Sequence, residues 1–328
     1  MNLSDDKSYY GVNRRYWRGV DMDLSVRLAP DNPRGLTLKN PVMTASGTFG
    51  YGTENNHLFD IRKLGAIVCK GTFLEPRDGN PQPRIAETPS GMLNAIGMEG
   101  IGIEALIRDK APVWADWDVP VIVNIAGETV EEYAAIAERL DWVNGISGIE
   151  VNISCPNIRA GGAEFGISPD TAATVTAAVR KATSLPVLVK LTPNTSEIMA
   201  VAEAVAGEGA DALTLINTLK GMAIDIYSRK PVLGNITGGL SGPAIKPVAL
   251  YMVYEVAKVV NIPIIGCGGI STAADALEFI MAGATAVQTG TAGFSNPLVH
   301  LEILEGIEDF MTKKGINSIE EIIGVARQ

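Results

Sequence analysis

Short apolar runs alternate with helical patterns along most of the chain. From residue 41 onward, eight runs rich in apolar, often β-branched residues are bounded by glycine, proline or polar residues, as buried parallel strands are. These runs cover residues 41–47, 64–71, 120–127, 148–155, 186–192, 212–218, 263–270 and 286–290. Helical spacing of apolar residues predicts helices between them, most clearly at 130–140, 169–182, 196–206, 248–260 and 272–281. Eight strand–helix units predict an α/β fold, a (β/α)8 TIM barrel.

Two of the intervals between runs are much longer than the others. Residues 72–119 and 219–262 each exceed what one connecting helix needs, and long loops in a compact barrel usually serve as lids or binding arms. We expect them to be inserted loops over the barrel mouth. Residues 24–28 and 36–38 alternate around a turn-rich segment and predict a hairpin. The predicted organisation is an N-terminal extension and hairpin at 1–35, then a single barrel domain at 36–328.

Charge and hydropathy exclude several classes of function. The chain has 328 residues, a net charge of −10 and a pI of about 4.9, which disfavours binding to nucleic acid or to an anionic membrane. No apolar run has transmembrane length, and the first residues lack the basic-then-apolar order of a signal peptide. We therefore expect a cytoplasmic protein.

Few cysteines and histidines are available for metal binding or nucleophilic catalysis. The three cysteines, Cys69, Cys155 and Cys267, are far apart, so neither a disulfide framework nor a cysteine metal cage is encoded, and no metal site is expected. The two histidines, His57 and His300, are too few for a three-histidine zinc site. Neither follows a predicted strand, which disfavours a Ser-His-Asp triad.

The residues at the C-terminal ends of the eight runs are polar or glycine. In a parallel barrel these ends surround one mouth, where ligands bind. A single lysine there is usually solvated and points outward, but two lysines together with several amides favour a site for a planar, anionic, hydrogen-bonding ligand. The strand-end residues are Ser46, Gly47, Lys70, Gly71, Asn124, Asn152, Cys155, Lys190, Asn217, Thr218, Gly268, Gly269, Gly290 and Thr291.

Cys155 stands between Ser154 and Pro156, where a strand is expected to end because proline has no N–H for the ladder. A free cysteine is more often a small buried hydrophobe, and that interpretation stays open. The polar neighbours and the loop that follows, with Gly161 and Gly162, favour a partly exposed thiol that acts as a base or nucleophile.

Glycines stand at the C-terminal ends of the seventh and eighth runs. Gly268-Gly269 and Gly290-Thr291 come at the two strands where barrels commonly bind phosphate through backbone N–H groups, and Gly242 lies in the preceding loop. One glycine pair alone is ordinary turn chemistry. Both pairs together predict a phosphate site.

The chain resembles the dihydroorotate dehydrogenases, specifically the class 1 soluble group and the subtype that works with an iron–sulfur flavoprotein. The resemblance covers the chain from about residue 36 to its end. It is carried by the motifs at residues 45–50, 70, 75–77, 79–81, 94–97, 152–157, 161–162, 165–166, 190–194, 216–218, 237–243, 266–269 and 290–291.

The resemblance implies an FMN enzyme that oxidises (S)-dihydroorotate to orotate in pyrimidine biosynthesis. It implies that Cys155 takes the C5 proton while the C6 hydride passes to FMN. The substrate residues that it implies are Lys70, Asn94, Ala95, Ile96, Gly97, Met98, Asn152, Asn157, Asn217 and Thr218. The FMN residues that it implies are Ser46, Lys70, Gly71, Asn124, Asn152, Lys190, Ile216, Gly242, Gly268, Gly269, Gly290 and Thr291.

The resemblance further implies a partner subunit that carries FAD and a 2Fe-2S cluster and passes electrons to NAD. The assembly would be a homodimer of barrels within a heterotetramer. This chain departs from the usual family pattern in a longer N-terminus and in Met98-Glu99-Gly100, where members usually have Leu-Gln-Asn or Leu-Glu-Asn.

Two alternatives remain open from the residues. An FMN barrel of the dihydropyrimidine dehydrogenase type shares the Ser-Cys-Pro motif but typically has histidine where this chain has Asn157. A phosphosugar-binding barrel without flavin would use the same glycines after the seventh and eighth strands.

Overall fold

The structure is a computed structural model that describes residues 22–55, 57–154, 156–157 and 163–327. Its centre is an eight-stranded parallel sheet in the order β3-β18-β17-β12-β11-β8-β7-β4. The strands are β3 (Val42–Thr44), β4 (Ile67–Val68), β7 (Val121–Ile125), β8 (Gly148–Asn152), β11 (Val187–Lys190), β12 (Ala212–Leu215), β17 (Ile264–Cys267) and β18 (Ala286–Thr289). Each strand lies inside one of the eight predicted runs, so the predicted strands are confirmed, although the ladder uses fewer residues than each run contains.

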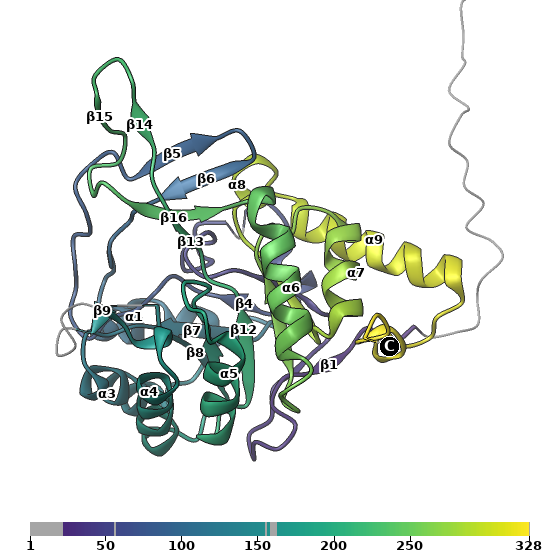
Figure 1. Cartoon of the computed structure of the whole chain (residues 1–328). Helices are drawn as coiled ribbons and strands as arrows, with labels where there is room; N and C mark the ends of the chain where they lie inside the picture. Colours follow the sequence, from purple (N-terminus) through teal and green to yellow (C-terminus); the bar gives the residue numbers. More distant parts are fainter. Residues whose placement is uncertain (1–21, 56, 155, 158–162, 328) are drawn as a thin grey trace, which may run out of the picture.

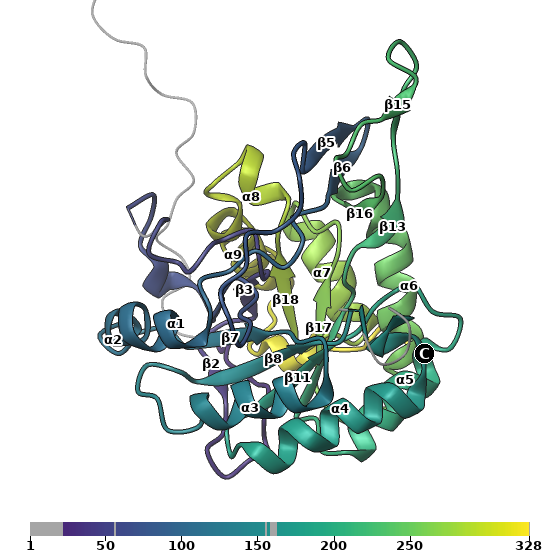
Figure 2. The same cartoon turned by 90° about the vertical axis from the view of Figure 1, so that its left-hand side faces the viewer.

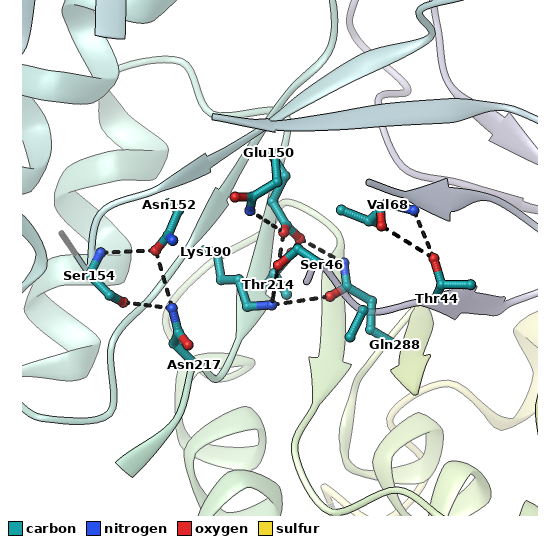
Figure 3. A network of polar contacts seen from close by, with 12 residues as sticks. Thr44, Ser46, Val68, Glu150, Asn152, Ser154, Lys190, Thr214, Asn217 and Gln288 are labelled. Carbon is teal, nitrogen blue, oxygen red and sulfur yellow. Dashed lines mark hydrogen bonds and ion pairs between the residues drawn. The ribbon is translucent and has the colours of Figure 1, made fainter. Parts of the chain in front are cut away.

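The sheet closes on itself between its first and last strands. Gly65 N–H donates to the Val42 carbonyl at 2.8 Å, and Met43 pairs with Ala66 in parallel register. The Thr44 hydroxyl adds a side-chain tie, since it accepts from Val68 N–H at 3.0 Å (Figure 3). The fold is therefore a (β/α)8 TIM barrel, as the alternation predicts.

Helices surround the barrel (Figures 1 and 2). In α3 the buried side chains are Tyr133, Ile136, Ala137 and Leu140, which is the spacing of a single helical stripe. The helices are α1 (Ile103–Asp109), α2 (Ala111–Trp114), α3 (Val130–Leu140), α4 (Pro169–Ala182), α5 (Ile198–Gly207), α6 (Lys246–Val256), α7 (Ala273–Ala282), α8 (Ala292–Ser295) and α9 (Val299–Lys314). Short 3₁₀ turns occupy η1 (Ile61–Lys63), η3 (Phe165–Ile167), η4 (Pro243–Ile245) and η5 (Ile319–Ile322).

Helix boundaries follow the capping chemistry. α3 and α4 have the predicted bounds, whereas α6 begins and ends earlier than the expected 248–260. The earlier start places Pro247 in the first turn, where a missing N–H costs nothing. The N-cap of α7 is Thr272, whose hydroxyl accepts from Asp275 N–H while the Asp275 carboxylate accepts from Thr272 N–H.

The two long intervals form one additional sheet over the barrel. β5 (Ile85–Thr88) and β6 (Gly91–Asn94) come from the first interval, and β13 (Leu219–Gly221) and β16 (Gly238–Ser241) come from the second. They pair antiparallel in the order β13-β16-β6-β5, which we call the cap sheet. Beyond it projects a two-stranded arm, β14 (Ile224–Asp225) with β15 (Lys230–Pro231) (Figure 2). Inserted loops over the mouth are thus confirmed.

The predicted N-terminal hairpin is present as β1 (Val26–Arg27) and β2 (Thr37–Leu38). Val26, Leu28 and Leu38 belong to the barrel's hydrophobic core. The turn binds the bottom of the barrel, because Asn32 donates to Asp211, which directly precedes β12, at 3.1 Å. Residues 1–21 of the expected extension lie outside the described residues, and the proposed division at 35/36 stays a prediction.

Among the described residues, no helix is both long and apolar enough to cross a membrane.

Candidate active site

A cavity of about 540 Å³ opens between the C-terminal strand ends and the cap sheet. Its size lies within the range of small-molecule and cofactor pockets. Strand-end residues such as Lys190 and Asn152 line it from the barrel, while Met92, Asn94 and Ser241 line it from the cap sheet. The two sequence insertions therefore build one wall of the same cavity that the barrel mouth begins.

The cavity floor holds a buried network around Glu150 of β8 (Figure 3). This carboxylate is completely buried and accepts hydrogen bonds from the Asn124 amide at 2.7 Å and the Gln288 amide at 2.7 Å. The Thr214 hydroxyl donates to it at 3.0 Å. The Lys190 ammonium lies 3.8 Å from it and supplies the counter-charge, so the buried acid has both hydrogen-bond donors and a cation.

Lys190 connects this network to the cavity. Its ammonium also donates to the Ser46 hydroxyl at 3.3 Å and contacts the Gln288 side-chain oxygen at 3.5 Å. Burial is the largest influence on the pKa of Lys190 and lowers it, but the negative groups beside it, Glu150 first and Cys267 second, together outweigh burial, and the net pKa is raised. The floor thus presents a fixed positive charge to whatever fills the cavity. Burial also raises the pKa of the neighbouring Cys267 thiol, which the Lys190 charge only partly offsets.

A second polar group joins the loops after β8 and β12 (Figure 3). The Asn217 amide donates to the Asn152 side-chain oxygen at 3.1 Å and to the Ser154 hydroxyl at 3.0 Å. The Tyr133 hydroxyl of α3 donates a hydrogen bond to the Asn152 backbone carbonyl at 2.6 Å. Both asparagines line the cavity, so the residue before Cys155 is tied to the cavity wall.

The central residue predicted from the sequence, Cys155, lies outside the described residues. Its downstream neighbours Pro156 and Asn157 form β9 (Pro156–Asn157), which pairs antiparallel with β10 (Ala163–Glu164). The backbone of Asn157 is placed by this pairing, whereas its predicted side-chain role is not tested.

The cavity rim carries a second lysine, Lys70, from the loop after β4. Its ammonium pairs with the Glu99 carboxylate at 3.1 Å, and Arg84 of the first insertion pairs with the other carboxylate oxygen. The hydrogen bond from Lys70 lowers the pKa of Glu99. Lys70 and Glu99 both line the cavity, so an ion pair stands where an anionic ligand would enter.

Glycines shape the cavity wall after β17 and β18. Gly269 has φ +74°, and a Cβ there would lie 2.8 Å from the backbone nitrogen of Lys246 and 2.9 Å from the Gly242 carbonyl oxygen, so only glycine fits. Across this loop the Thr291 hydroxyl donates to Ser241 at 2.8 Å. The result is a backbone-lined pocket with hydroxyls at its edge, a surface suited to phosphate.

Most of the predicted site residues meet at this cavity. The residues predicted to hold a cofactor all line it: Ser46, Lys70, Gly71, Asn124, Asn152, Lys190, Ile216, Gly242, Gly268, Gly269, Gly290 and Thr291. Of the predicted substrate residues, Lys70, Asn94, Ile96, Met98, Asn152, Asn217 and Thr218 line it.

Ala95 and Gly97 are not among the lining residues. Alternate residues of this segment face opposite ways: Ala95 is buried beside Leu93 and Leu233, and a Cβ on Gly97 would lie 2.2 Å from the Asn80 side chain. Their contribution to the cavity is to shape the segment that presents Asn94, Ile96 and Met98.

Sequence reasoning missed Glu99, Glu150 and Gln288. A signal for two of them was present: Glu150 and Gln288 are polar residues inside otherwise apolar runs, and a polar residue on a buried strand needs a partner. Glu99 had no such signal, because it comes from an irregular loop.

Among the described residues, no group of three or more His, Cys, Asp or Glu side chains is arranged to hold a metal ion. The arrangement instead offers an ammonium, carboxamides and glycine-lined backbone to an organic anion.

Comparison with known proteins identifies relatives. Residues 30–311 match the family model described as dihydroorotate dehydrogenase. The chain is 55% identical over 305 residues to the dihydroorotate dehydrogenase B (NAD(+)) catalytic subunit of Geotalea daltonii, covering 93% of this chain and 98% of that protein. It is 57% identical over 289 residues to the catalytic subunit of the same name from Trichlorobacter lovleyi, covering 88% of this chain and 95% of that protein.

Proposed function

The chain belongs to the dihydroorotate dehydrogenase family, and we propose from that premise that it oxidises (S)-dihydroorotate to orotate in pyrimidine biosynthesis. The observation that carries the proposal is the convergence of two lysines and three asparagines on one cavity at the barrel mouth, namely Lys70, Lys190, Asn124, Asn152 and Asn217. A flat, anionic pyrimidine with several carbonyl and N–H groups needs donors and acceptors of this kind. The phosphosugar-binding alternative explains the glycines but not the amides.

The family is flavin-dependent, and we assign FMN to this chain. The cavity fits FMN: the buried Lys190 ammonium and the Asn124 amide offer donors to a flavin ring, and the glycine-lined pocket at Gly268, Gly269 and Gly290 offers backbone to its phosphate. When bound, FMN supplies the ring that accepts the hydride from C6 of the substrate. A fixed ammonium stabilises the negative charge that such a ring gains.

The substrate is held by the residues that line the outer part of the cavity. Lys70 supplies a cation for the substrate carboxylate, and Asn94, Asn152 and Asn217 supply amides for the ring. Asn152 and Asn217 bond to each other at 3.1 Å, so they reach the ligand as a pre-arranged pair, which lowers the entropy cost of binding.

Cys155 is the base in this proposal. A C5 proton beside a carbonyl requires a base whose pKa lies near the working pH, and a thiol near 8.5 satisfies this far better than a serine hydroxyl does. The proton passes from C5 to the thiolate while the C–H electron pair at C6 leaves as hydride, and a C5–C6 double bond forms. Support comes from Ser154, whose hydroxyl accepts from Asn217 and so anchors the chain one residue before the base.

A separate partner subunit takes the electrons onward. The relatives are named as catalytic subunits of an NAD(+) enzyme, and this chain has three cysteines, too few for a four-cysteine cluster. We propose that the partner carries FAD and a 2Fe-2S cluster, and that a homodimer of barrels binds one partner per barrel in a heterotetramer. The chain would then act as one catalytic domain from residue 36 onward, with residues 1–35 as its extension.

Turnover of the isolated chain tests the activity. With an artificial dye as acceptor, dihydroorotate should be oxidised. Dihydrouracil and dihydrothymine should react at least about 100-fold more slowly, because they lack the carboxylate that Lys70 binds in this proposal. Equal rates with dihydrouracil would support the dihydropyrimidine alternative and contradict the proposal.

The partner assignment has its own test. NAD should not be reduced by the isolated chain and should be reduced once the iron–sulfur flavoprotein is added. Efficient NAD or fumarate reduction by the chain alone would contradict the assignment.

A further inference from the structure

Glu150 is a charged residue in the barrel interior, where burying a charge costs free energy, and the proposed mechanism gives it no role. It lies in the middle of β8, fully buried, and it neither reaches solvent nor lines the cavity. A buried carboxylate is expensive to keep, and barrels fill such positions with branched apolar residues. Its retention points to a function for the charge itself.

The contacts of Glu150 lead to one group. Asn124, Thr214 and Gln288 saturate its oxygens with donors at 2.7–3.0 Å, which fixes the carboxylate in one orientation. That orientation places an oxygen 3.8 Å from the Lys190 ammonium, whose own side chain is 5% exposed. Asn124 and Lys190 line the cavity directly above, so Glu150 acts on the cavity through them.

Among the described residues, Glu150 supplies the carboxylate that pairs with Lys190, and no second carboxylate pairs with it. The titratable groups facing it are Glu150 from β8 and the Cys267 thiol from β17. Burial raises the pKa of Cys267, and of the two groups the Glu150 carboxylate has the larger effect on the pKa of Lys190. Serine and glutamine oxygens from Ser46 and Gln288 complete its surroundings. Removing the Glu150 charge would leave a desolvated amine that favours its neutral form.

We propose that Glu150 is a positioning residue whose fixed negative charge keeps Lys190 protonated before the flavin is reduced. The inference rests on the proposed function, because it requires FMN above Lys190. With the ammonium already charged, Lys190 would balance the negative charge that remains when two electrons and only one proton reach the flavin. Without Glu150, the amine is neutral beforehand, and reduction draws a second proton from solvent onto Lys190 or onto the flavin.

Counting protons on reduction of the FMN-loaded chain tests this directly. The enzyme is reduced by two electrons at about pH 8, and proton uptake is read from the pH dependence of the midpoint potential. Wild-type protein should take up one proton per electron pair. Glu150→Gln should take up two, which doubles the slope of potential against pH.

Two matched variants separate charge from packing. Glu150→Asp keeps the charge and should take up one proton, and Thr214→Val removes one hydrogen bond to Glu150 but no charge and should also take up one. One proton in Glu150→Gln, or two in either control variant, would overturn the proposal. Wild-type protein that binds no FMN would instead overturn the proposed function, so the two failures are distinguishable.

A measurement on the flavin-free wild-type chain covers the case in which Glu150→Gln does not fold. The ¹³Cε chemical shift of Lys190 should report an ammonium at about pH 8 despite complete burial. A neutral Lys190 in that protein would show that Glu150 does not hold the proton there.

Discussion

The site contains two lysine–glutamate pairs, which consist of the same residue types but differ in how far their side chains are exposed to solvent. Lys190 and Glu150 are 3.8 Å apart with side chains 5% and 0% exposed, whereas Lys70 and Glu99 are 3.1 Å apart with side chains 24% and 39% exposed. The closer pair has the weaker interaction, because water screens the rim and not the floor. We therefore expect the buried pair to determine the charge of Lys190 and to contribute to the stability of the folded chain. At the rim, a ligand can replace Glu99 as the partner of Lys70.

The largest effect we expect concerns the rate of the reaction and leaves stability unchanged. Cys155→Ser should lower turnover with dihydroorotate by roughly 10²–10⁴, the usual contribution of a positioned base, with partial recovery at high pH. Orotate binding, followed by the absorbance of the bound flavin, should stay unchanged. Near-wild-type turnover at neutral pH would remove Cys155 from the mechanism.

Breaking the floor pair should cost stability instead. Lys190→Met leaves the Glu150 carboxylate buried without its cation, which costs about 3–5 kcal/mol of unfolding free energy. The matched change on the rim, Lys70→Met, should cost less than about 1 kcal/mol because that pair is half-solvated. Chemical denaturation of both flavin-free variants makes the comparison, and equal losses would contradict it.

A buried histidine that pairs with no carboxylate among the described residues extends the same contrast. His300 packs against Phe49 and Phe59, with ring centroids 5.8 and 6.2 Å away, and burial lowers its pKa. The folded chain therefore holds a neutral ring while the unfolded chain takes up a proton below its ordinary pKa of about 6.5. This contribution to stability is present above that pH and is lost as the pH falls towards the folded pKa.

Denaturation at about pH 7.5 and about pH 5 measures the effect. For one histidine the slope is at most about 1.4 kcal/mol per pH unit. His300→Gln should flatten this dependence, and the exposed His57→Gln should leave it as in the wild type. Identical pH dependence in the His300 variant would show that the ring is not kept neutral.

The smallest effect concerns Glu99. Glu99→Gln frees Lys70 and removes a negative charge from the entrance of an anion site, so orotate should bind about three- to fivefold more tightly at low salt, with the gain shrinking as salt rises. Glu87→Gln makes the same charge change on an exposed part of the cap sheet and serves as the control. Weaker orotate binding in the Glu99 variant would mean that its carboxylate positions Lys70 for the ligand.

Much of the site could be foreseen because it depends on strand ends. Lys70, Asn124, Asn152 and Lys190 each lie towards the C-terminal end of an apolar run, and parallel connectivity brings all C-terminal ends to one mouth. Ala95 and Gly97 were predicted from the resemblance to bind substrate. Only the structure of residues 94–98 shows that these two residues face away from the cavity.

The residues that reasoning from the sequence missed depend on contacts across the barrel. Glu150 meets Gln288 from β18 and Thr214 from β12, and no local pattern says which of many distant residues will point at it. Glu99 meets Lys70 only because the first insertion folds back over β4.

The sequence by itself determined the eight strands, the two insertions that cover the mouth, and the identity of the polar residues at the strand ends. These follow from periodicity and chain connectivity, which are local or nearly local properties. Only the tertiary structure decided which charges are buried together and which face water. That decision depends on packing between residues far apart in the chain, and burial in turn sets the strength of every electrostatic interaction in the site.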